Sequence, residues 1–409
     1  MKILFLTNEY PPHIYGGAGV HAQHLTSELL NLESEKPDLE ILCFGDQEKS
    51  EKNNRLLGIR GPSEPSFGAL RYKKLLDPLY RNLIMVGSAG KADLIHCHTW
   101  YTYLAGCLLK QIMGIPLIIT AHSLEPLRPW KKEQLGDAYH ATSWLEKTAL
   151  ENSDAVIAVS EAMKSDMVSI YNINPAKARV IYNGIDIEHF RKIENPEILT
   201  KYGIDPQKPY VLFVGRITLQ KGIIHLVDAI PRLKKDIQVV LCAGAPDNDE
   251  IAEEMKQKVN NAKKSFGNDI IWITKCLPEK DLVPLYSHAS IFVCPSVYEP
   301  FGIINLEAMA CETAVVASAT GGIQEVVQDG QTGILVPFES SGNGKGGPKN
   351  PEKFSMDLAG AINSLLQSPE KIKKMAAASR QRVEEKFSWK SIAKQTMAFY
   401  RETIEAQRL

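Results

Sequence analysis

The sequence lacks the paired cysteines, long apolar runs and charge excess that mark several classes of protein. Its seven cysteines stand singly, without a CxxC pair, so we expect neither a disulfide framework nor a zinc ribbon. No stretch approaches the roughly 18 continuous apolar residues of a membrane span. The formal net charge of -1 gives no reason to expect a nucleic acid or an anionic membrane as partner.

The beginning of the chain also lacks the features of a secretory signal. Its apolar run stops at Thr7-Asn8-Glu9, which is too short for the core of a signal peptide and fits a buried strand. We therefore expect a cytoplasmic protein whose cysteines are reduced and mostly buried. Hydrophobic residues make up 44% of the 409 residues, which are more than one core usually organises, so two domains are expected.

Short apolar runs alternate with segments of helical periodicity along the whole chain. The predicted strands are Ile3–Thr7, Glu40–Phe44, Leu94–His96, Leu117–Thr120, Ala155–Val159, Val180–Tyr182, Tyr210–Val214, Gln238–Cys242, Ile270–Thr274, Ile291–Cys294 and Ala314–Ser318. Apolar runs of this length between helices are typical of βαβ units with buried parallel strands. The fold class predicted is therefore α/β, with doubly wound parallel sheets.

The strand pattern restarts near residue 210, after a polar segment rich in proline. We predict an N-terminal domain over residues 1–186 and a C-terminal domain over 187–388. A last helix, about 389–409, is expected to pack back onto the first domain. The glycine-rich segment 340–350 has the composition of a mobile surface loop.

Residues that follow strands are the first candidates for a site, because doubly wound sheets bind ligands at the carboxyl ends of their strands. Gly16 and Gly17 follow the first strand and precede a helix, where backbone N–H groups can approach a phosphate. Gly17–Ala22 also fits a loose dinucleotide fingerprint. The glycines lie too far from the strand for that reading, and no acidic residue ends the second strand. A purely structural turn is the other alternative.

Two cations follow the strand 210–214, on a turn bounded by glycines. A guanidinium such as that of Arg216 can grip a phosphate with two hydrogen bonds, and the ammonium of Lys221 adds a compact charge. Together they could neutralise a departing diphosphate. A solvated basic turn is the alternative if the pair is taken alone.

Two carboxylates follow the strand 291–294. Glu299 stands in the loop and Glu307 in the helix beyond it, so they could contact different parts of one extended ligand. Between them, Pro300 and Gly302 suit a tight turn at the start of a helix, whose free N–H groups could hold a diphosphate.

These motifs together resemble the retaining nucleotide-sugar glycosyltransferases of glycosyltransferase family 4. The resemblance runs from end to end and implies a GT-B fold, with two facing Rossmann-like domains and a deep interdomain cleft. It is strongest to the branch of glycogen synthases that use ADP-glucose and of α-maltose-1-phosphate synthases. The stretches Glu9–Pro12, His122–Lys131 and Ser318–Gly322 support it.

The resemblance also implies roles for individual residues. His122 would lie beside the transferred sugar, Glu299 would hold the sugar's hydroxyls, and Glu307 would hold the ribose. The implied catalytic residues are His122, Arg216, Lys221 and Glu299. The implied donor-binding residues are Gly16, Gly17, Asn183, Arg216, Lys221, Lys275, Leu277, Glu299, Phe301, Gly302, Ile303 and Glu307. The cations make a metal unnecessary, so we expect no metal or other cofactor.

The function implied is that of a hexosyltransferase that retains the anomeric configuration. It would move glucose from ADP-glucose, or from UDP-glucose, to the end of an α-1,4-glucan. The alternative acceptor is glucose 1-phosphate, which would give maltose 1-phosphate. The first loop keeps this alternative open, because Ile14-Tyr15-Gly16-Gly17 lacks the lysine that classical starch synthases carry there.

Two functions of other classes stay open beside the transferase. The same scaffold serves nucleotide-sugar epimerases, and a binding protein without turnover would use the same donor pocket. An epimerase needs no acceptor pocket, whereas the aromatic and basic segment 126–132 is suited to one. The nucleotide base, the acceptor and the oligomeric state are not determined by the sequence.

Overall fold

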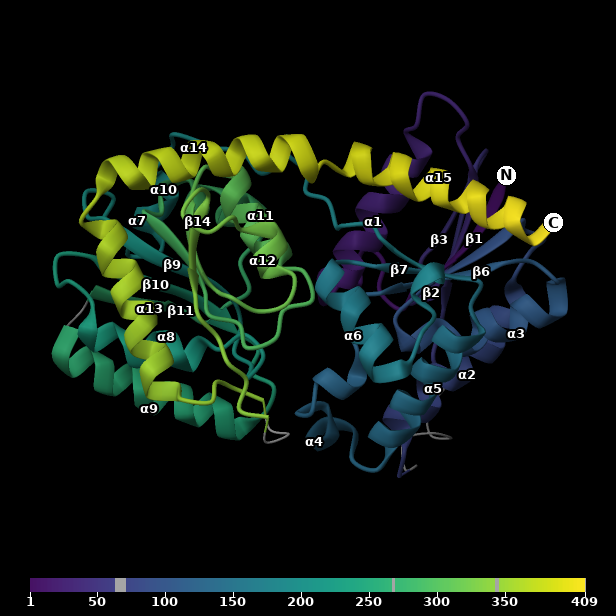
Figure 1. The fold of residues 1–409 in the computed structure, drawn as a ribbon, viewed down its shortest axis with the longest axis horizontal. Coiled ribbons are helices and arrows are strands. Elements are labelled where there is room, and N and C mark those ends of the chain that lie inside the picture. Colours follow the sequence, from purple (N-terminus) through teal and green to yellow (C-terminus); the bar gives the residue numbers. More distant parts are fainter. Residues whose placement is uncertain (63–70, 267–268, 343–345, 409) are drawn as a thin grey trace. The chain divides into compact units, whose positions relative to one another are not determined.

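The computed structural model describes residues 1–62, 71–266, 269–342 and 346–408, which form two compact α/β units (Figure 1). Unit 1 contains Met1–Gly184 together with Trp389–Leu409, and unit 2 contains Ile185–Ser388. The division lies two residues before the boundary proposed from the sequence, and the last helix belongs to unit 1. The segment expected to be mobile, 340–350, includes residues 343–345, which lie outside the described residues.

Unit 1 is built on an eight-stranded sheet with the order β3-β4-β2-β1-β5-β6-β7-β8. Its strands are β1 (Lys2–Leu6), β2 (Asp38–Phe44), β3 (Glu48–Glu51), β4 (Asn54–Ile59), β5 (Leu94–His98), β6 (Leu117–Ala121), β7 (Ala155–Ala158) and β8 (Ala178–Val180). All neighbouring strands are parallel except β3 and β4. The residues of β5, β6 and β7 are buried throughout, as expected for parallel strands covered on both faces.

The helices of unit 1 follow the strands in sequence, apart from the last one. They are α1 (Gly17–Leu30), α2 (Lys73–Ser88), α3 (Tyr103–Met113), α4 (Lys131–Leu135), α5 (Ala138–Asn152), α6 (Glu161–Tyr171) and α15 (Trp389–Arg408). Helix α15 returns from the far end of the chain and packs along α1 (Figure 1). Its residues Trp389, Ile392 and Tyr400 belong to the core of the unit. A Cβ atom at Gly184 would lie 2.5 Å from the Trp389 ring, so this packing needs a glycine.

Unit 2 is built on a six-stranded parallel sheet with the order β11-β10-β9-β12-β13-β14. Its strands are β9 (Tyr210–Arg216), β10 (Gln238–Gly244), β11 (Ile270–Ile273), β12 (Ile291–Cys294), β13 (Ala314–Ser318) and β14 (Gly333–Val336). Strand order reverses between β9 and β12, as in the doubly wound nucleotide-binding folds.

The helices of unit 2 cover both faces of its sheet. They are α7 (Glu197–Lys201), α8 (Ile223–Ala229), α9 (Asp249–Phe266), α10 (Glu279–His288), α11 (Ile303–Ala310), α12 (Ile323–Val326), α13 (Pro351–Leu366) and α14 (Pro369–Lys386). Helices α8 and α13 lie side by side (Figure 1) and share the core with α9. No helix of the described residues is long and apolar enough to cross a membrane.

The two parallel α/β sheets confirm the fold class, and every predicted apolar run lies in a strand or overlaps one. The prediction did not include the strands β3, β4 and β14. It placed the last strand of the first domain at 180–182, whereas β8 is Ala178–Val180. The cysteines follow the expectation except Cys276, which is exposed, and Cys107, which is half-buried.

Candidate functional site

In unit 2, the polar residues singled out in the sequence meet where the strand order reverses. Arg216 ends β9, and the loop after β12 carries Glu299. Because β9 and β12 are neighbours, their carboxyl ends open into the crevice in which doubly wound sheets bind ligands.

The turn 215–222 packs directly against the loop after β12. Gly222 has a φ of +61°, and a Cβ atom there would lie 2.0 Å from the carbonyl oxygen of Pro295. The N–H of Val297 donates to the carbonyl of Gln220 at 2.9 Å. This close approach requires glycine at position 222, and it brings Lys221 against the carboxylate of Glu299.

Lys221 and Glu299 form a largely buried ion pair. The Nζ atom of Lys221 donates to Oε2 of Glu299 at 2.6 Å, and the hydroxyl of Ser296 donates to the same oxygen at 3.2 Å. The side chain of Glu299 is 8% exposed and that of Lys221 is 21% exposed. Burial alone would lower the pKa of Lys221, but the charge of Glu299 raises it above its usual value. The ammonium therefore stays charged in a partly dry site.

Glu307 lies on α11, just after the first turn of this helix. Its Oε2 accepts a hydrogen bond from the hydroxyl of Tyr286 at 2.8 Å. Burial raises the pKa of Glu307 to about 7, although the bond from Tyr286 acts in the opposite direction. The carboxyl group therefore changes its charge close to neutral pH.

Arg216 is held differently from Lys221. Its Nη2 donates to Oδ1 of Asp247 at 2.7 Å, and its side chain is 55% exposed. Asp247 begins the sequence Asp247-Asn248-Asp249, an Asp-x-Asp pattern that the search of the sequence for such a pattern overlooked. In this structure the first carboxylate of that pattern orients the guanidinium.

The loop after β13 packs against the backbone of Glu299. Gly321 has a φ of +49°, and a Cβ atom there would lie 2.2 Å from the carbonyl oxygen of Glu299. The N–H of Gly322 donates to that carbonyl at 3.0 Å. The sequence analysis cited these two glycines only as support for the family resemblance. In the structure they let the loop after β13 pack closely against the backbone of Glu299.

Asn305 is a candidate that the sequence analysis missed. It is fully buried on the first turn of α11, and neither its amide nitrogen nor its amide oxygen has a partner among the described residues. Unpaired buried amides are costly unless a ligand or water satisfies them. A polar residue within the apolar run Ile303-Ile304-Asn305-Leu306 was the available signal.

The other donor-binding candidates of unit 2 take varied positions. The ring of Phe301 is 2% exposed and packs against Phe387, with 5.9 Å between the ring centroids. Its side chain therefore belongs to the core, and contact with a ligand would come from its backbone. Gly302 caps α11, whose first residue is Ile303. Lys275 and Leu277 follow the edge strand β11, where Lys275 is exposed.

In unit 1 the strand order reverses between β1 and β5. The loop after β1 leads to α1, with Gly16 as N-cap and Gly17 as first helical residue. The carboxylate of Glu9 accepts the N–H groups of Tyr15 and Gly16 at 2.8 and 2.9 Å. The backbone donors of Tyr15 and Gly16 are therefore occupied by a carboxylate in this structure, and the approach of these glycines to a phosphate stays a prediction.

Four histidines surround the end of β5. Nδ1 of His98 lies 3.0 Å from Nε2 of His122, and Nδ1 of His21 lies 2.7 Å from Oδ1 of Asn183. His96 bonds Tyr400 with Nδ1 and Thr120 with Nε2, and it lies deeper in the sheet. The structure therefore places the candidates His122 and Asn183 in one cluster, with two histidines that the prediction did not select.

Burial keeps this cluster neutral. It lowers the pKa of His98 and of His122 well below the usual value, and that of His21 to about 4. Neighbouring imidazoles add to the effect on His122. The ligand atoms of His21, His98 and His122 lie within 4.8 Å of one another, and three neutral imidazoles are a donor set that suits zinc.

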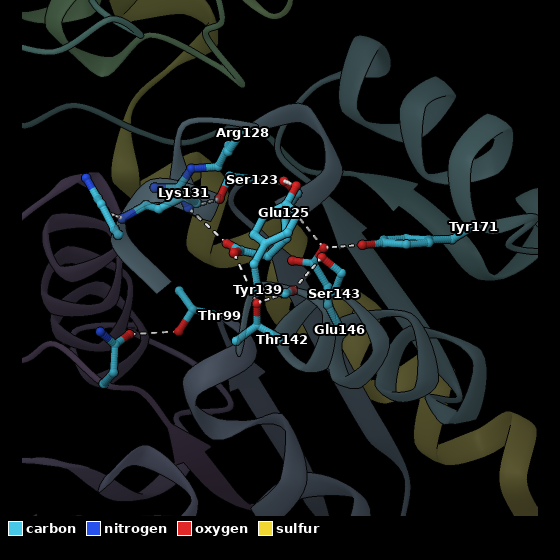
Figure 2. A network of polar contacts seen from close by, with 12 residues as sticks. Thr99, Ser123, Glu125, Arg128, Lys131, Tyr139, Thr142, Ser143, Glu146 and Tyr171 are labelled. Carbon is cyan, nitrogen blue, oxygen red and sulfur yellow. Dashed lines mark hydrogen bonds and ion pairs between the residues drawn. The ribbon is translucent and has the colours of Figure 1, made fainter. Parts of the chain in front are cut away.

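A polar network extends from Ser123, the residue after His122, into the helices (Figure 2). The N–H of Glu125 and the hydroxyl of Tyr171 both donate to Oε2 of Glu146, at 2.8 and 2.6 Å. Glu125 and Glu146 are both buried. Burial and the nearby charge of Glu125 raise the pKa of Glu146, so this carboxyl group holds a proton near neutral pH.

Comparison with known proteins finds similarity to enzymes of glycosyl transfer. Residues 15–189 match the family described as Glycosyltransferase Family 4, and residues 194–382 match Glycosyl transferases group 1. The α-maltose-1-phosphate synthase of Mycolicibacterium smegmatis is 44% identical over 98% of this chain and 99% of its own. A glycogen synthase of Mycobacterium tuberculosis is 28% identical over 98% of this chain and 94% of its own.

The fold is shared with solved structures at lower identity. Sucrose-phosphate synthase from Thermosynechococcus elongatus superposes with a TM-score of 0.78 at 24% identity, covering 99% of this chain and all of its own. The catalytic domain of starch synthase IV from Arabidopsis thaliana superposes with a TM-score of 0.73 at 18% identity, over 98% and 99% of the two chains.

Proposed function

The chain belongs to glycosyltransferase family 4, and we propose that it transfers glucose from a nucleoside diphosphate glucose with retention of anomeric configuration. One arrangement carries the proposal: Lys221, Glu299 and Arg216 lie together at the switch point of the unit 2 sheet. That crevice is where a nucleotide binds in a doubly wound fold.

Each charged residue has a role that its surroundings support. The ammonium of Lys221 and the guanidinium of Arg216 stabilise the negative charge that develops on the departing diphosphate. Glu299, fixed by Lys221 and Ser296, holds hydroxyls of the donor sugar. Glu307 holds the ribose and is steadied by Tyr286. With these groups supplying the charge, the transfer needs no metal, and activity should survive dialysis against EDTA.

His122 has a different role in unit 1. Because it is neutral, it donates or accepts a hydrogen bond at the transferred sugar and carries no charge. The acceptor oxygen attacks from the face that the diphosphate leaves, and its proton passes to the leaving phosphate oxygen. The carbon–oxygen bond to the diphosphate breaks as the new glycosidic bond forms.

We favour ADP-glucose as donor and glucose 1-phosphate as acceptor, with maltose 1-phosphate and ADP as products. The support is the identity to a relative named for that product, 44%, against 28% to one named glycogen synthase. The absence of a lysine from Ile14-Tyr15-Gly16-Gly17 agrees with this choice. Elongation of an α-1,4-glucan is the second candidate.

A single assay separates these functions. Purified protein is incubated with ADP-glucose or UDP-glucose, alone, with glucose 1-phosphate and with glucan, and nucleotide release and new sugars are measured. ADP release that depends on glucose 1-phosphate, with maltose 1-phosphate formed, supports the proposal. Release that depends on glucan alone selects elongation. Conversion of the donor sugar without any acceptor would indicate an epimerase, and no turnover at all would indicate a binding protein.

A further inference from the structure

Arg128 lies close to His122, in the segment that joins β6 to α4. The segment makes one short 3-10 turn, Glu125–Leu127, and Arg128 ends it. Nη1 of Arg128 donates to the hydroxyl of Ser123 at 3.2 Å, and Ser123 directly follows His122. The guanidinium therefore bonds the side chain of the residue that follows His122, whose imidazole we assign to the transferred sugar.

One edge of this guanidinium is used and the other is not. Nη1 also donates to Oε1 of Glu125, at 3.3 Å. Nε is buried and has no partner, and Nη2 bonds no residue in the part of the chain that the structure describes. The Nε–H and the adjacent Nη2–H form the fork with which arginine binds two oxygens of a phosphate or carboxylate.

Neighbouring residues hold the guanidinium in this orientation (Figure 2). The hydroxyl of Thr142 donates to Oε2 of Glu125 at 3.4 Å, and the hydroxyl of Tyr139 donates to the Glu125 carbonyl at 2.7 Å. Oε2 of Glu146 accepts a hydrogen bond from the N–H of Glu125. Glu125 is thus fixed from three sides, and it fixes Arg128 in turn. A buried N–H left unpaired within so ordered a surrounding indicates a ligand that is received there.

The charge of the surroundings suits an anion. Glu146 holds a proton, because burial and the charge of Glu125 raise its pKa. That charge is balanced by Arg128. Lys131 adds a cation on the same turn, where its N–H donates to the Arg128 carbonyl at 2.8 Å.

We propose that Arg128 binds the phosphate group of the acceptor through its Nε and Nη2 edge, and so selects glucose 1-phosphate over an uncharged glucan end. The inference rests on the proposed function, since it names the residue that recognises that acceptor. An ordinary ion pair with Glu125 is the simpler role for Arg128. It explains Nη1 and leaves the buried Nε–H without a reason.

The test compares three variants with the wild-type enzyme, using ADP-glucose as donor. Arg128→Gln keeps an amide near the site but loses the charge and the fork. Arg128→Lys keeps the charge and loses the fork. Arg408→Gln is the matched control, because it removes one positive charge from an exposed position at the end of α15 in the same unit.

We expect Arg128→Gln to raise the KM for glucose 1-phosphate roughly 10- to 100-fold, the range for hydrogen bonds to a charged group. Arg128→Lys should give a smaller rise, and Arg408→Gln none. The KM for ADP-glucose should not change, and neither should the rate measured with free glucose, an acceptor that has no phosphate. Inorganic phosphate should compete with glucose 1-phosphate in the wild type and lose that effect in Arg128→Gln.

Other outcomes would overturn the assignment. If Arg128→Gln slows transfer to glucose and to glucose 1-phosphate by the same factor, Arg128 only supports the fold of the segment. If Arg128→Gln does not fold, Arg128→Lys decides: an unchanged KM and unchanged competition by phosphate contradict the proposal. A wild-type enzyme that extends glucan and ignores glucose 1-phosphate refutes the proposed acceptor itself. The wild-type enzyme is therefore assayed with both acceptors first, so that failure of the proposed function is distinguished from failure of the Arg128 assignment.

Discussion

Units 1 and 2 share one architecture, yet the side chains at the ends of their central strands differ in charge. Those of unit 2 are charged, whereas the imidazoles of unit 1 are neutral. Beside β9 and β12, unit 2 places an ammonium, a guanidinium and two carboxyl groups. Beside β1 and β5, unit 1 places imidazoles whose pKa values burial has lowered, so they are neutral. The same sheet edge thus suits a diphosphate in one unit and uncharged hydroxyls in the other. The difference comes from the loops and not from the fold.

Lys221→Met tests the charged half of this comparison and should have the largest effect. Without the ammonium, the departing diphosphate loses one of its stabilising charges, and kcat should fall roughly 100- to 1,000-fold. The change also leaves Glu299 buried without its partner, which costs about 3 kcal/mol of stability. Steady-state kinetics and thermal unfolding measure the two losses.

The double variant Lys221→Met, Glu299→Gln separates the two losses. Replacing both charges removes the unpaired carboxylate, so most of the stability should return. Activity should stay low, because the charge that faces the diphosphate is still absent. A double variant that recovers activity along with stability would mean that the pair serves the fold alone.

His122→Gln tests the neutral half. Glutamine keeps a hydrogen-bonding amide but not the imidazole geometry, so kcat should fall by about 10- to 100-fold, less than for Lys221→Met. Because His122 is neutral, the wild-type rate should show no titration of this residue near pH 6.5. An inflection at that pH that disappears in His122→Gln would show a charged histidine and contradict the contrast between the units.

Glu307→Gln tests the pH dependence that unit 2 should have. The pKa of Glu307 is about 7 in the folded protein, whereas the usual pKa of a glutamate side chain is 4.5. The folded state therefore binds this proton more tightly, and the stabilisation that the proton gives is complete below pH 4.5 and lost as the pH rises through 7. The difference in Tm between Glu307→Gln and the wild type should shift in favour of the variant between pH 4.5 and 8. A constant difference would exclude the shift.

Tyr171→Phe should have the smallest effect. It removes the hydrogen bond from the tyrosine hydroxyl to Glu146. Since Glu146 is protonated, this bond joins two neutral groups, and its loss should cost about 1 kcal/mol in urea unfolding at pH 7. A bond to an ionised carboxylate would cost clearly more. A loss of about 3 kcal/mol would therefore show that the carboxyl group of Glu146 is ionised.

The two units also differ in how far their sites could be predicted. In unit 2, Arg216, Lys221, Glu299 and Glu307 stand in two short segments, each directly after a strand. Strand order then brings these segments together, so spacing along the chain was enough to select the residues. Their assigned roles remain predictions, since the structure shows their positions and partners only.

The cluster of unit 1 is assembled from segments that are distant in sequence. His21 comes from α1, His98 from β5 and His122 from the loop after β6, and only His122 was selected. A single histidine in an apolar run is most often a core residue, so sequence alone could not group them. The same holds for Glu125 and Glu146, because the burial that raises the pKa of Glu146 arises only in the tertiary structure.

The strands missed by the prediction have a physical reason as well. Strand β3 has the sequence Glu-Lys-Ser-Glu and is exposed throughout, so no apolar pattern marks it. It pairs antiparallel with β4 at the edge of the sheet, where charged side chains are tolerated.

Helix α15 has a consequence for how the protein is made. It follows unit 2 in the chain but supplies Trp389, Ile392 and Tyr400 to the core of unit 1. During synthesis, Ile185–Ser388 leaves the ribosome as one uninterrupted stretch and can fold as soon as it emerges. The first 184 residues, although made earlier, wait with part of their core uncovered until the last helix arrives. The core of unit 1 is therefore completed only after the whole of unit 2 has been synthesised.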